Sequence, residues 1–452
     1  MTDPVDLEFD AEGRLFVVEM RGYSERREEA LGRIKLLIDE DGDGLFDKAT
    51  IYAENLKWPT SACCYDGGVF VAASPDLLYF KDTDGDGVAE VKKTVFTGFG
   101  PAGGRLNMQA LLNSLQWGPD NRIWGTTGRL GGQVRRPGQP ASEALDLRGA
   151  DFSFDPVSLD LRPENGTAQF GMSFDSEGRR YLCSNSNHLQ WVAWERSWLD
   201  DNPYHRMPSP VVNVAVGGGA APVFRSSPDE PWRIVRTRWR VSGVVKGIVE
   251  GGGRVSGYFT SASGVTLYVG DAFPDSYRDT AFIGDVGSNL VHHKVIHRRN
   301  GAIQPLAERI AGEFDKRTEF LRSEDNWFRP VNFANGPDGC LYVCDMYREV
   351  IEHPWSLPAG IKRHLDLNSG NDRGRIWRIV PAGHSRPPHS RRPDNGWWRR
   401  LHRRLAYEKG SPAEPLLPQG SAGGANLEDR WALAFALHEM NTPEVMTKAW
   451  RT

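Results

Sequence analysis

Two short acidic segments have the residue types and spacing of calcium-binding loops. Residues 39–47 read DEDGDGLFD and residues 82–90 read DTDGDGVAE, each with acidic side chains at positions one, three, five and nine and glycine at six. Calcium prefers several oxygen ligands that a tight turn gathers around one point. The predicted ligands are Asp39, Asp41, Asp43, Asp47 and the Leu45 carbonyl in the first segment, and Asp82, Asp84, Asp86, Glu90 and the Val88 carbonyl in the second.

Each acidic segment is expected to connect two β-strands. An EF-hand needs a bidentate glutamate at position twelve, but this sequence has Thr50 and Lys93 there. The flanking runs, such as IKLLI before the first segment and KKTVFTGF after the second, are rich in β-formers. The sequence therefore predicts two structural calcium sites on outer loops, with plain Asp-Gly turns as the alternative.

A second pattern recurs along the chain: an aspartate in a turn, followed by an apolar strand. The aspartates are Asp10, Asp66, Asp120, Asp175, Asp279 and Asp338. They are 54 to 59 residues apart, except for an interval of 104 that suggests a repeat without its signature near residue 227. About 50 residues of β-structure per repeat is the length of a propeller blade. We therefore predict an all-β fold over residues 1–381, a six-bladed β-propeller with seven blades as the alternative.

Composition narrows the classes of function. The 452 residues are 39% hydrophobic and 25% charged, which is ordinary for a globular protein. A net charge of −4 argues against a general nucleic-acid-binding role, because no excess of basic side chains offsets a phosphate backbone. No apolar run is long enough for a transmembrane helix, and no signal peptide is readable at Met1. The five cysteines form neither CxxC nor CxxCH, so no zinc site, redox dithiol or covalent haem is expected.

The character of the chain changes after Pro381. Residues 382–396 form a Pro-rich basic linker, and residues 397–452 hold two amphipathic patterns that predict the beginning of an α-helical repeat segment. The arginines of this part are interpreted as a solvated helix face. We expect the segment to dock loosely on the propeller, through Trp397, Trp398 and Trp431, and to add little to its stability.

Several long strings then carry a family resemblance. GRIKLLIDEDGDGLFDKAT, GTAQFGMSFDSEGRRYLCSNSNHLQ and DNWFRPVNFANGPDGCLYVCDMYREVIEHPW resemble the propeller module of a family named membrane-bound dehydrogenases. That module is typical of planctomycete and verrucomicrobial secreted proteins and is distantly similar to soluble sugar dehydrogenases that use pyrroloquinoline quinone. The resemblance covers nearly all of residues 1–381. HEAT-like repeats and a cytochrome c domain usually follow in the family, and the haem domain is absent from this sequence, so we expect a fragment.

The resemblance implies an anionic quinone cofactor and a base beside the substrate hydroxyl. Carboxylates of a quinone need cationic or amide partners, and alcohol oxidation needs a proton acceptor. The candidate cofactor-binding residues are Arg21, Asn113, Arg225, Arg329 and Arg348, and the candidate catalytic residues are His292, Asp345 and His353. We expect them to converge at one end of the propeller channel, away from the calcium loops. The alternative is structural: Asp345 and Arg348 pair to close the last blade, and His353 caps a turn.

Three functions remain open at this point. The first is a quinone-dependent dehydrogenase of sugars or related alcohols, periplasmic or extracellular, that passes electrons to a cytochrome c partner. The second is a calcium-dependent lactonase or lyase, and the third is a propeller that binds a carbohydrate or a protein without chemistry. Fold alone does not choose among them.

Overall fold

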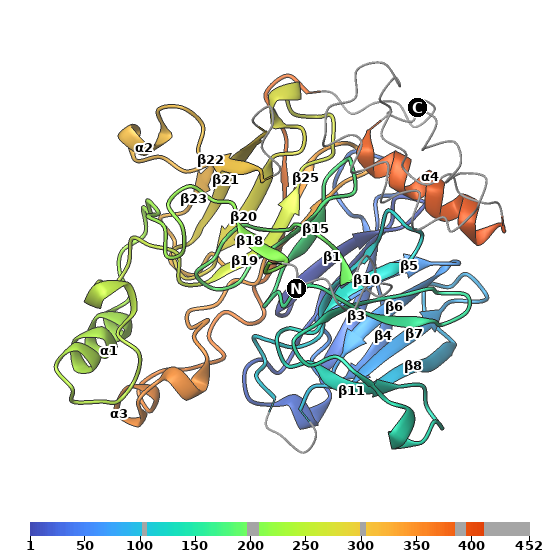
Figure 1. Cartoon of the computed structure of the whole chain (residues 1–452), viewed down its shortest axis with the longest axis horizontal. Helices are drawn as coiled ribbons and strands as arrows, with labels where there is room; N and C mark the ends of the chain where they lie inside the picture. The colour runs from blue at the N-terminus through green and yellow to red at the C-terminus, as the bar shows by residue number, and fades with distance from the viewer. Residues whose placement is uncertain (102–105, 197–207, 299–303, 385–394, 411–452) are drawn as a thin grey trace.

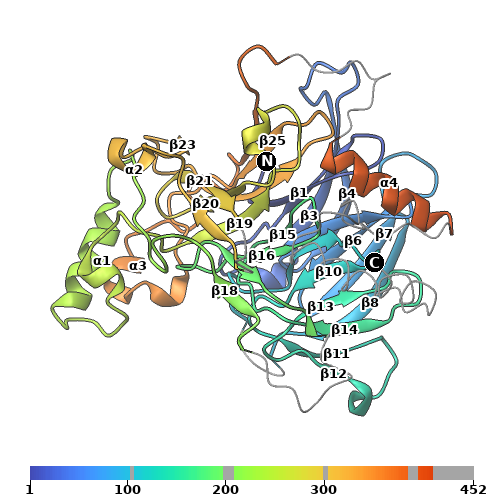
Figure 2. The same cartoon turned by 45° about the horizontal axis from the view of Figure 1, so that its top comes forward.

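The chain forms a six-bladed β-propeller, as the repeat predicted. The computed structural model describes residues 1–101, 106–196, 208–298, 304–384 and 395–410. Six antiparallel sheets surround a central axis, and one helix lies across one end of it (Figures 1 and 2). Among the described residues, no helix is both long and apolar enough to cross a lipid bilayer.

Each sheet is a blade, and its strands follow one another from the axis outward. The first blade contains β1 (Pro4–Phe9), β2 (Leu15–Glu19), β3 (Gly32–Ile38) and β4 (Lys48–Leu56), and the second contains β5 (Ser61–Tyr65), β6 (Gly68–Ala73), β7 (Asp76–Lys81) and β8 (Val91–Phe99). The third contains β9 (Asn113–Trp117), β10 (Ile123–Thr126), β13 (Asp151–Phe154) and β14 (Leu161–Glu164), and the fourth contains β15 (Met172–Phe174), β16 (Arg180–Leu182), β17 (Gln190–Val192) and β18 (Val211–Asn213). The fifth contains β19 (Ala262–Leu267), β20 (Ala281–Asp285), β21 (Leu290–His297) and β22 (Leu306–Glu308), and the sixth contains β24 (Pro330–Asn335), β25 (Leu341–Asp345) and β26 (Arg375–Ile379).

The remaining elements extend or connect the blades. β11 (Gly132–Arg135) and β12 (Leu145–Asp146) continue the second blade outward, and β23 (Leu321–Arg322) pairs with β21. The helices are α1 (Pro231–Val241), α2 (Glu313–Lys316), α3 (Ala359–Lys362) and α4 (Gly396–Glu408).

The ring closes where the first blade meets the last. Strand β1 lies beside β5 on one side and β24 on the other. Across the second of these contacts, Asn332 donates a hydrogen bond of 2.6 Å to Asp6, and Tyr23 donates one of 2.8 Å to the Ile351 carbonyl. The two chain ends of the propeller are therefore joined by side-chain and backbone contacts.

Strands β19 and β24, of the fifth and sixth blades, also lie close together. This approach requires a glycine at position 264, at φ +63°, because a Cβ there would lie 2.6 Å from the Cα of Asn332.

The repeated aspartates mark one position in every blade, the turn between its first and second strands. In the first blade, Asp10 accepts hydrogen bonds from the backbone amides of Glu12 and Arg14, which fixes the turn. The expected repeat without a signature near residue 227 is wrong. Blades four and five are neighbours, and the extra length between Asp175 and Asp279 includes an inserted segment that carries α1.

Helix α4 closes one end of the channel, the end where the first and second strands of each blade connect. We call it the lower end, although Figures 1 and 2 draw α4 in the upper right. It begins after Asn395, whose side chain accepts a hydrogen bond from the Trp398 amide. Its residues contact all six blades. Arg404 lies 3.9 Å from Glu8 of the first blade and donates to the Cys64 carbonyl of the second at 2.9 Å, and Arg403 donates to the Pro119 carbonyl of the third at 3.1 Å. Arg400, Gly396 and Trp398 donate to the carbonyls of Asp175, Val269 and Pro337 in the fourth, fifth and sixth blades, at 3.3, 2.8 and 2.9 Å.

The expectation of a loosely docked tail is wrong for the described part of it. Leu401 and Arg404 are buried, and three arginines of the expected solvated face donate hydrogen bonds to backbone carbonyls in or beside the turns between first and second strands. These carbonyls belong to Phe174, Pro119 and Cys64, and the arginines satisfy them. Trp431 lies outside the described residues.

Replacing Arg404 with alanine in the full chain should destabilise the propeller by about 2 kcal/mol, because a buried guanidinium loses its carbonyl and carboxylate partners together. Denaturant unfolding of the variant measures this change. Arg399→Ala, on the exposed side of the same helix, is the matched control and should change the unfolding free energy by less than about 0.5 kcal/mol. Equal stability of the two variants would contradict the role given to α4.

Candidate functional site

A cavity opens at the upper end of the channel, opposite α4. Its lining comes from five of the six blades, the second excepted, at the first strands and the loops that enter them and in the loops between second and third strands, and from the segment before β19. Loops in these places carry ligands in other propellers. It holds about 920 Å³ of empty space, part of it open to solvent. We call it the upper cavity.

The upper cavity has an apolar floor and a polar wall. The floor is formed by Val5, Met20, Met108, Val286, Val331 and Met346. The wall presents uncharged groups that both donate and accept hydrogen bonds, from Gln109, Gln169, Asn185, Thr260, Ser261 and Ser263. Some are held in place by the fold: Gln109 donates to the Tyr23 hydroxyl at 2.9 Å and to the Ile351 carbonyl at 2.8 Å.

The charged side of the upper cavity is formed by Arg233, Glu250 and Glu352. Burial alone would raise the pKa of Glu352, but Arg236 and Arg233 outweigh it and lower that pKa. Glu352 is also held by a hydrogen bond of 2.8 Å from the Ser356 hydroxyl. It is therefore an ionised carboxylate at neutral pH, paired with Arg236 at 2.5 Å and lining the cavity, and it is suited to accept a hydrogen bond.

Behind Arg233 lies a buried cluster around one carboxylate. Glu230 is 3.5 Å from Arg225, 3.3 Å from Arg233 and 3.4 Å from Arg329. Burial would raise the pKa of Glu230, but the three guanidinium groups outweigh it and lower that pKa. The cluster joins the start of α1 to the last blade, so these arginines hold the fold together at this point.

The loop 346–352, which follows β25, divides its residues between the upper cavity and the fold. Met346, Ile351 and Glu352 line the cavity. Asp345 points the other way: it accepts hydrogen bonds from the backbone amides of Arg329 and Tyr347 and from the Trp377 ring, at 2.8, 3.0 and 3.1 Å. Burial raises its pKa. Met346, Ile351 and Glu352 of this stretch therefore line the cavity, and the candidate Asp345 does not.

Two candidate arginines are fully buried and have protein partners. Arg329 donates to the carbonyls of Val286, Arg348 and Glu349, at 2.8, 2.8 and 2.7 Å, and burial lowers its pKa to about 10. Arg348 pairs with Asp3 of the first blade and donates to the Tyr23 carbonyl at 3.0 Å. Arg348 therefore closes the last blade onto the first, through Asp3 rather than through the Asp345 partner that the structural alternative named.

The candidate histidines lie away from the cavity lining. His353 accepts a hydrogen bond of 3.1 Å from the Trp355 amide and so caps a turn. His292 is buried in β21, with its Nδ1 at 2.6 Å from Glu319. Burial keeps the pKa of His292 well below its usual value, so its ring is neutral. Neither histidine is among the residues that line the upper cavity.

The three remaining candidate residues, Arg21, Asn113 and Arg225, contact other groups of the protein. Arg21 reaches the Leu31 carbonyl at 3.5 Å, and Asn113 donates to the carbonyls of Leu111 and Gln169 at 2.7 and 2.9 Å. Arg225 is engaged by Glu230 and donates to Asn289 at 3.2 Å. Gln169 and Asn185, which lie beside these candidates at the ends of blade strands, line the cavity wall.

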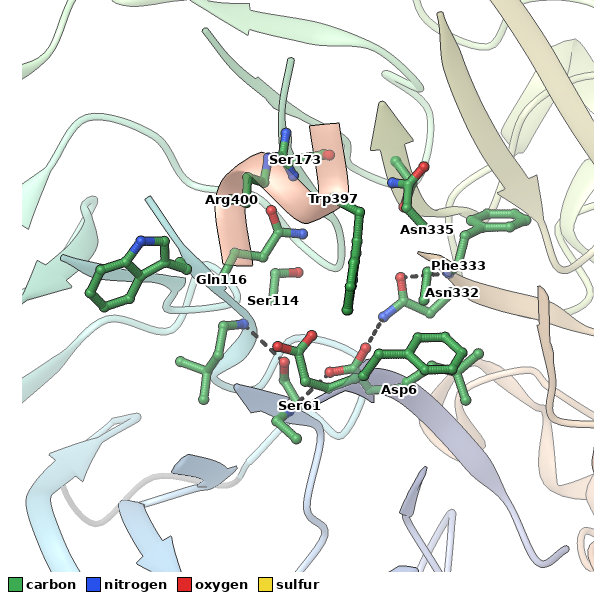
Figure 3. Close-up of a pocket in the computed structure, with 18 of the residues that line it drawn as sticks. Asp6, Ser61, Ser114, Gln116, Ser173, Asn332, Phe333, Asn335, Trp397 and Arg400 are labelled. Atoms are coloured by element: carbon green, nitrogen blue, oxygen red, sulfur yellow. Dashed lines mark hydrogen bonds between the residues drawn. The ribbon is translucent and has the colours of Figure 1, made fainter. Parts of the chain in front are cut away.

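A second cavity, the lower chamber, lies between the channel and α4. It contains about 930 Å³ of empty space. Trp397 points from α4 into it, and Asp6 and Asn332 lie hydrogen-bonded on its far side (Figure 3). Burial raises the pKa of Asp6 to about 6 and that of Glu8, which also lines the chamber, to about 8. Because α4 lies across this end of the channel, we take the upper cavity, at the opposite end, as the candidate site.

The two acidic loops have nearly the same internal hydrogen bonds. Asp39 accepts from the amides of Gly42 and Gly44 at 2.7 and 3.0 Å, and Asp82 accepts from those of Gly85 and Gly87 at 2.7 and 2.8 Å. In each loop carboxylate oxygens gather within 4.8 Å of one another, from Asp39, Asp41 and Asp47 in the first and from Asp82, Asp84, Asp86 and Glu90 in the second. Asp43 is not in the first group; it accepts from the Leu45 amide at 2.6 Å.

Both loops join the third and fourth strands of their blades, at the end of the sheets away from the upper cavity. The second loop also spans two blades, because the Ala89 amide donates to the Tyr52 carbonyl of β4 at 2.9 Å. Hydrogen bonds from Thr83 lower the pKa of Glu90. Its carboxylate is therefore ionised at neutral pH and suited to a hard cation.

Sequence reasoning missed Arg233, Glu250 and Glu352 as site residues. Glu352 lies between the candidates Arg348 and His353 in the sequence, and the sequence does not show which way its side chain points. Arg233 and Glu250 belong to the inserted segment, which was interpreted as part of an ordinary repeat. A signal was present, because the interval of 104 residues contains PWRIVRTRWRV, a run with apolar residues at helical spacing.

Comparison with known proteins gives a family and several distant structures. Residues 1–383 match the family model described as "Domain of unknown function (DUF7133)". No curated protein matches the chain. A luciferin-regenerating enzyme structure is similar at a TM-score of 0.45 and 10% identity, covering 84% of this chain and 92% of that one. A putative oxidoreductase (glucose dehydrogenase) from Thermus thermophilus is similar at 0.44 and 13%, covering 76% and 90%. The PQQ-bound aldose sugar dehydrogenase from Streptomyces coelicolor is similar at 0.39 and 12%, covering 76% and 88%.

Replacing Arg348 with alanine should lower the unfolding free energy by about 3–5 kcal/mol, because Asp3 is then left as a buried carboxylate without its cation. Chemical denaturation measures the loss. Asp3→Asn in the Arg348→Ala background should recover part of it, because the uncompensated charge is gone. Arg373→Ala, an exposed arginine nearby, serves as the control. A fully stable Arg348→Ala protein would contradict the closing role.

Proposed function

The chain belongs to the DUF7133 family, and we propose that it binds a carbohydrate or a related small polyol in the upper cavity. The observation that carries this proposal is the convergence of uncharged hydrogen-bonding side chains from separate blades over an apolar floor. A sugar presents hydroxyl groups on its edges and C–H groups on its faces, so it needs both kinds of surface together.

The chemistry of the cavity wall suits hydroxyl groups better than charged ones. Carboxamides of Gln169 and Asn185 each offer a donor and an acceptor, and Thr260 and Ser261 add hydroxyls. Glu352 supplies one carboxylate, held by Arg236 and Ser356, which can accept a hydrogen bond from a sugar hydroxyl.

The family resemblance noted in the sequence supports oxidation of the bound sugar or alcohol as the reaction, with a cytochrome c acceptor and a periplasmic or extracellular location. A quinone with three carboxylates, when bound, would take up the two electrons. The described residues of the cavity do not fit that quinone well. Arg225, Arg329 and Arg348 are occupied by protein partners, and Arg233 stands beside Glu250 and Glu352. No step is therefore assigned through it.

Calorimetry with a panel of neutral monosaccharides and polyols tests the proposal. At least one of these compounds should bind. Asn185→Ala and Glu352→Gln should each weaken its binding about tenfold or more, because each variant loses a hydrogen bond to the ligand, from an uncharged group in the first and a charged group in the second. Gln139→Ala, an exposed amide on the second blade's extension, should bind as the wild type does. Dye reduction with the bound sugar, with and without added quinone and calcium, then tests oxidation. Absence of binding across the panel, or unchanged binding by both cavity variants, would reject the site.

We also propose that the two acidic loops bind structural calcium. Support comes from their matching hydrogen bonds and from carboxylate oxygens within 4.8 Å of one another. Oxygen ligands from one tight turn are the donor set that calcium prefers. A cation in the second loop would hold Asp82 and Glu90 beside β4 of the neighbouring blade and so stabilise the contact between the first two blades.

Calcium at a hundredfold excess over its dissociation constant should stabilise the protein by about 2–3 kcal/mol per site, and chelation should remove this gain. Calorimetric unfolding with calcium and with chelator measures it. Asp84→Asn and Asp41→Asn should each reduce the gain, whereas Asp315→Asn on the exposed side of α2 should not. An unfolding temperature that does not respond to calcium would remove both sites.

A further inference from the structure

A segment of unusual composition projects from the propeller between the fourth and fifth blades. Residues 231–257 comprise α1 and the loop that follows it, and we call them the basic lobe. In Figures 1 and 2, α1 lies with α3 at the edge of the molecule, away from the sheets. The lobe is anchored through Trp232, which packs with Val350, Leu357 and Ile361 in a small core of its own. Its position is thus fixed on one side and open on the other.

The open side of the basic lobe is aliphatic. The exposed fractions are 38% for Val235, 58% for Val241, 68% for Val244, 77% for Ile248 and 46% for Val249. These are five of the 16 exposed large hydrophobic residues of the described chain, and they fall within 15 consecutive positions. Val241 and Val249 come together beside Gly253, where an added Cβ would lie 3.0 Å from the first and 3.8 Å from the second. Single exposed hydrophobic residues are ordinary, but a group of them marks a surface that another phase or molecule covers.

The same segment is strongly basic. It contains six lysines and arginines and one acidic residue, Glu250, in a chain whose net charge is −4. Arg233 and Arg236 are buried and paired with Glu230 and Glu352. Arg238, Lys246 and Arg254 are exposed beside the aliphatic side chains. The exposed charge of the lobe is therefore mainly positive, and its basic residues alternate in sequence with the exposed aliphatic ones.

We propose that the basic lobe docks on an anionic lipid surface. Protruding aliphatic side chains can enter the region between headgroups and acyl chains, and neighbouring lysines and arginines are attracted to negative headgroups. A carbohydrate polymer fits less well, because its recognition uses aromatic platforms and the patch is made of valine and isoleucine. A second copy docked patch to patch would bring like charges together. Charge and side-chain type thus both favour lipid.

Docking would place the upper cavity close to the lipid surface. Glu250, in the loop of the basic lobe, also lines the mouth of that cavity. The lipid contact does not depend on what the cavity binds, and it uses none of the cavity's uncharged wall residues. Failure of one proposal would therefore leave the other standing.

Vesicle co-sedimentation tests the docking with the full chain. The wild-type protein should bind vesicles that contain phosphatidylglycerol, bind vesicles of phosphatidylcholine alone at least about tenfold more weakly, and lose binding as salt rises. Val244→Asp with Ile248→Asp should lower the partition coefficient at least about tenfold, since two aliphatic groups no longer enter the bilayer. Arg238→Glu with Lys246→Glu should lower it similarly through charge.

Val157→Asp with Val216→Asp is the matched control, because these valines are 70% and 45% exposed and lie outside the lobe. It should bind as the wild type does. The proposal is overturned if the wild type binds no anionic vesicles, if it binds both lipids equally, or if the lobe variants bind unchanged. Sedimentation velocity without lipid tests the alternative that two copies of the chain contact each other through the patch. The patch is assigned to that contact if the wild type forms a dimer and binds no vesicles, and if the Val244→Asp, Ile248→Asp protein stays a monomer.

Discussion

Closure of the ring is the constraint on which the rest of this structure depends. A propeller has a stable channel only when the first and last blades hold each other, and here they do so by direct side-chain contacts. Arg348 and Asp3 form an ion pair between residues 345 positions apart, and Asn332 reaches Asp6 across the same boundary. Both pairs are buried, so each partner needs the other to remain in the protein interior.

Once the ring is closed, its two ends differ. The lower end is covered by α4, whose arginines satisfy carbonyls of loops from successive blades. The upper end stays open, and its loops alternate between residues that hold the ring and residues that face the cavity. Loop 346–352 shows both uses within seven positions, since Arg348 pairs with Asp3 while Glu352 faces the cavity. A residue's place in a functional loop therefore says little about its own role.

Buried charge explains why several plausible site residues serve the fold. Arg225, Arg233 and Arg329 surround Glu230, and Arg329 also donates to three backbone carbonyls. The uncharged amides of Gln169 and Asn185, in contrast, line the cavity. The buried ion pairs of this region hold the fold together, and most of the polar groups that line the cavity are uncharged.

The sequence by itself determined the blade repeat and the acidic loops, because each depends on local patterns, and the structure decided for six blades rather than seven. An aspartate turn followed by an apolar strand recurs once per blade, and the Asp-x-Asp-x-Asp-Gly spacing fixes a turn whatever surrounds it. Only the tertiary structure decided that α4 closes the channel, that residues 231–257 are an insertion, and that Glu352 rather than Asp345 or His353 faces the cavity. Those outcomes depend on which way a side chain points and on partners more than 300 residues away, such as Asp3 for Arg348, and no local spacing carries that information.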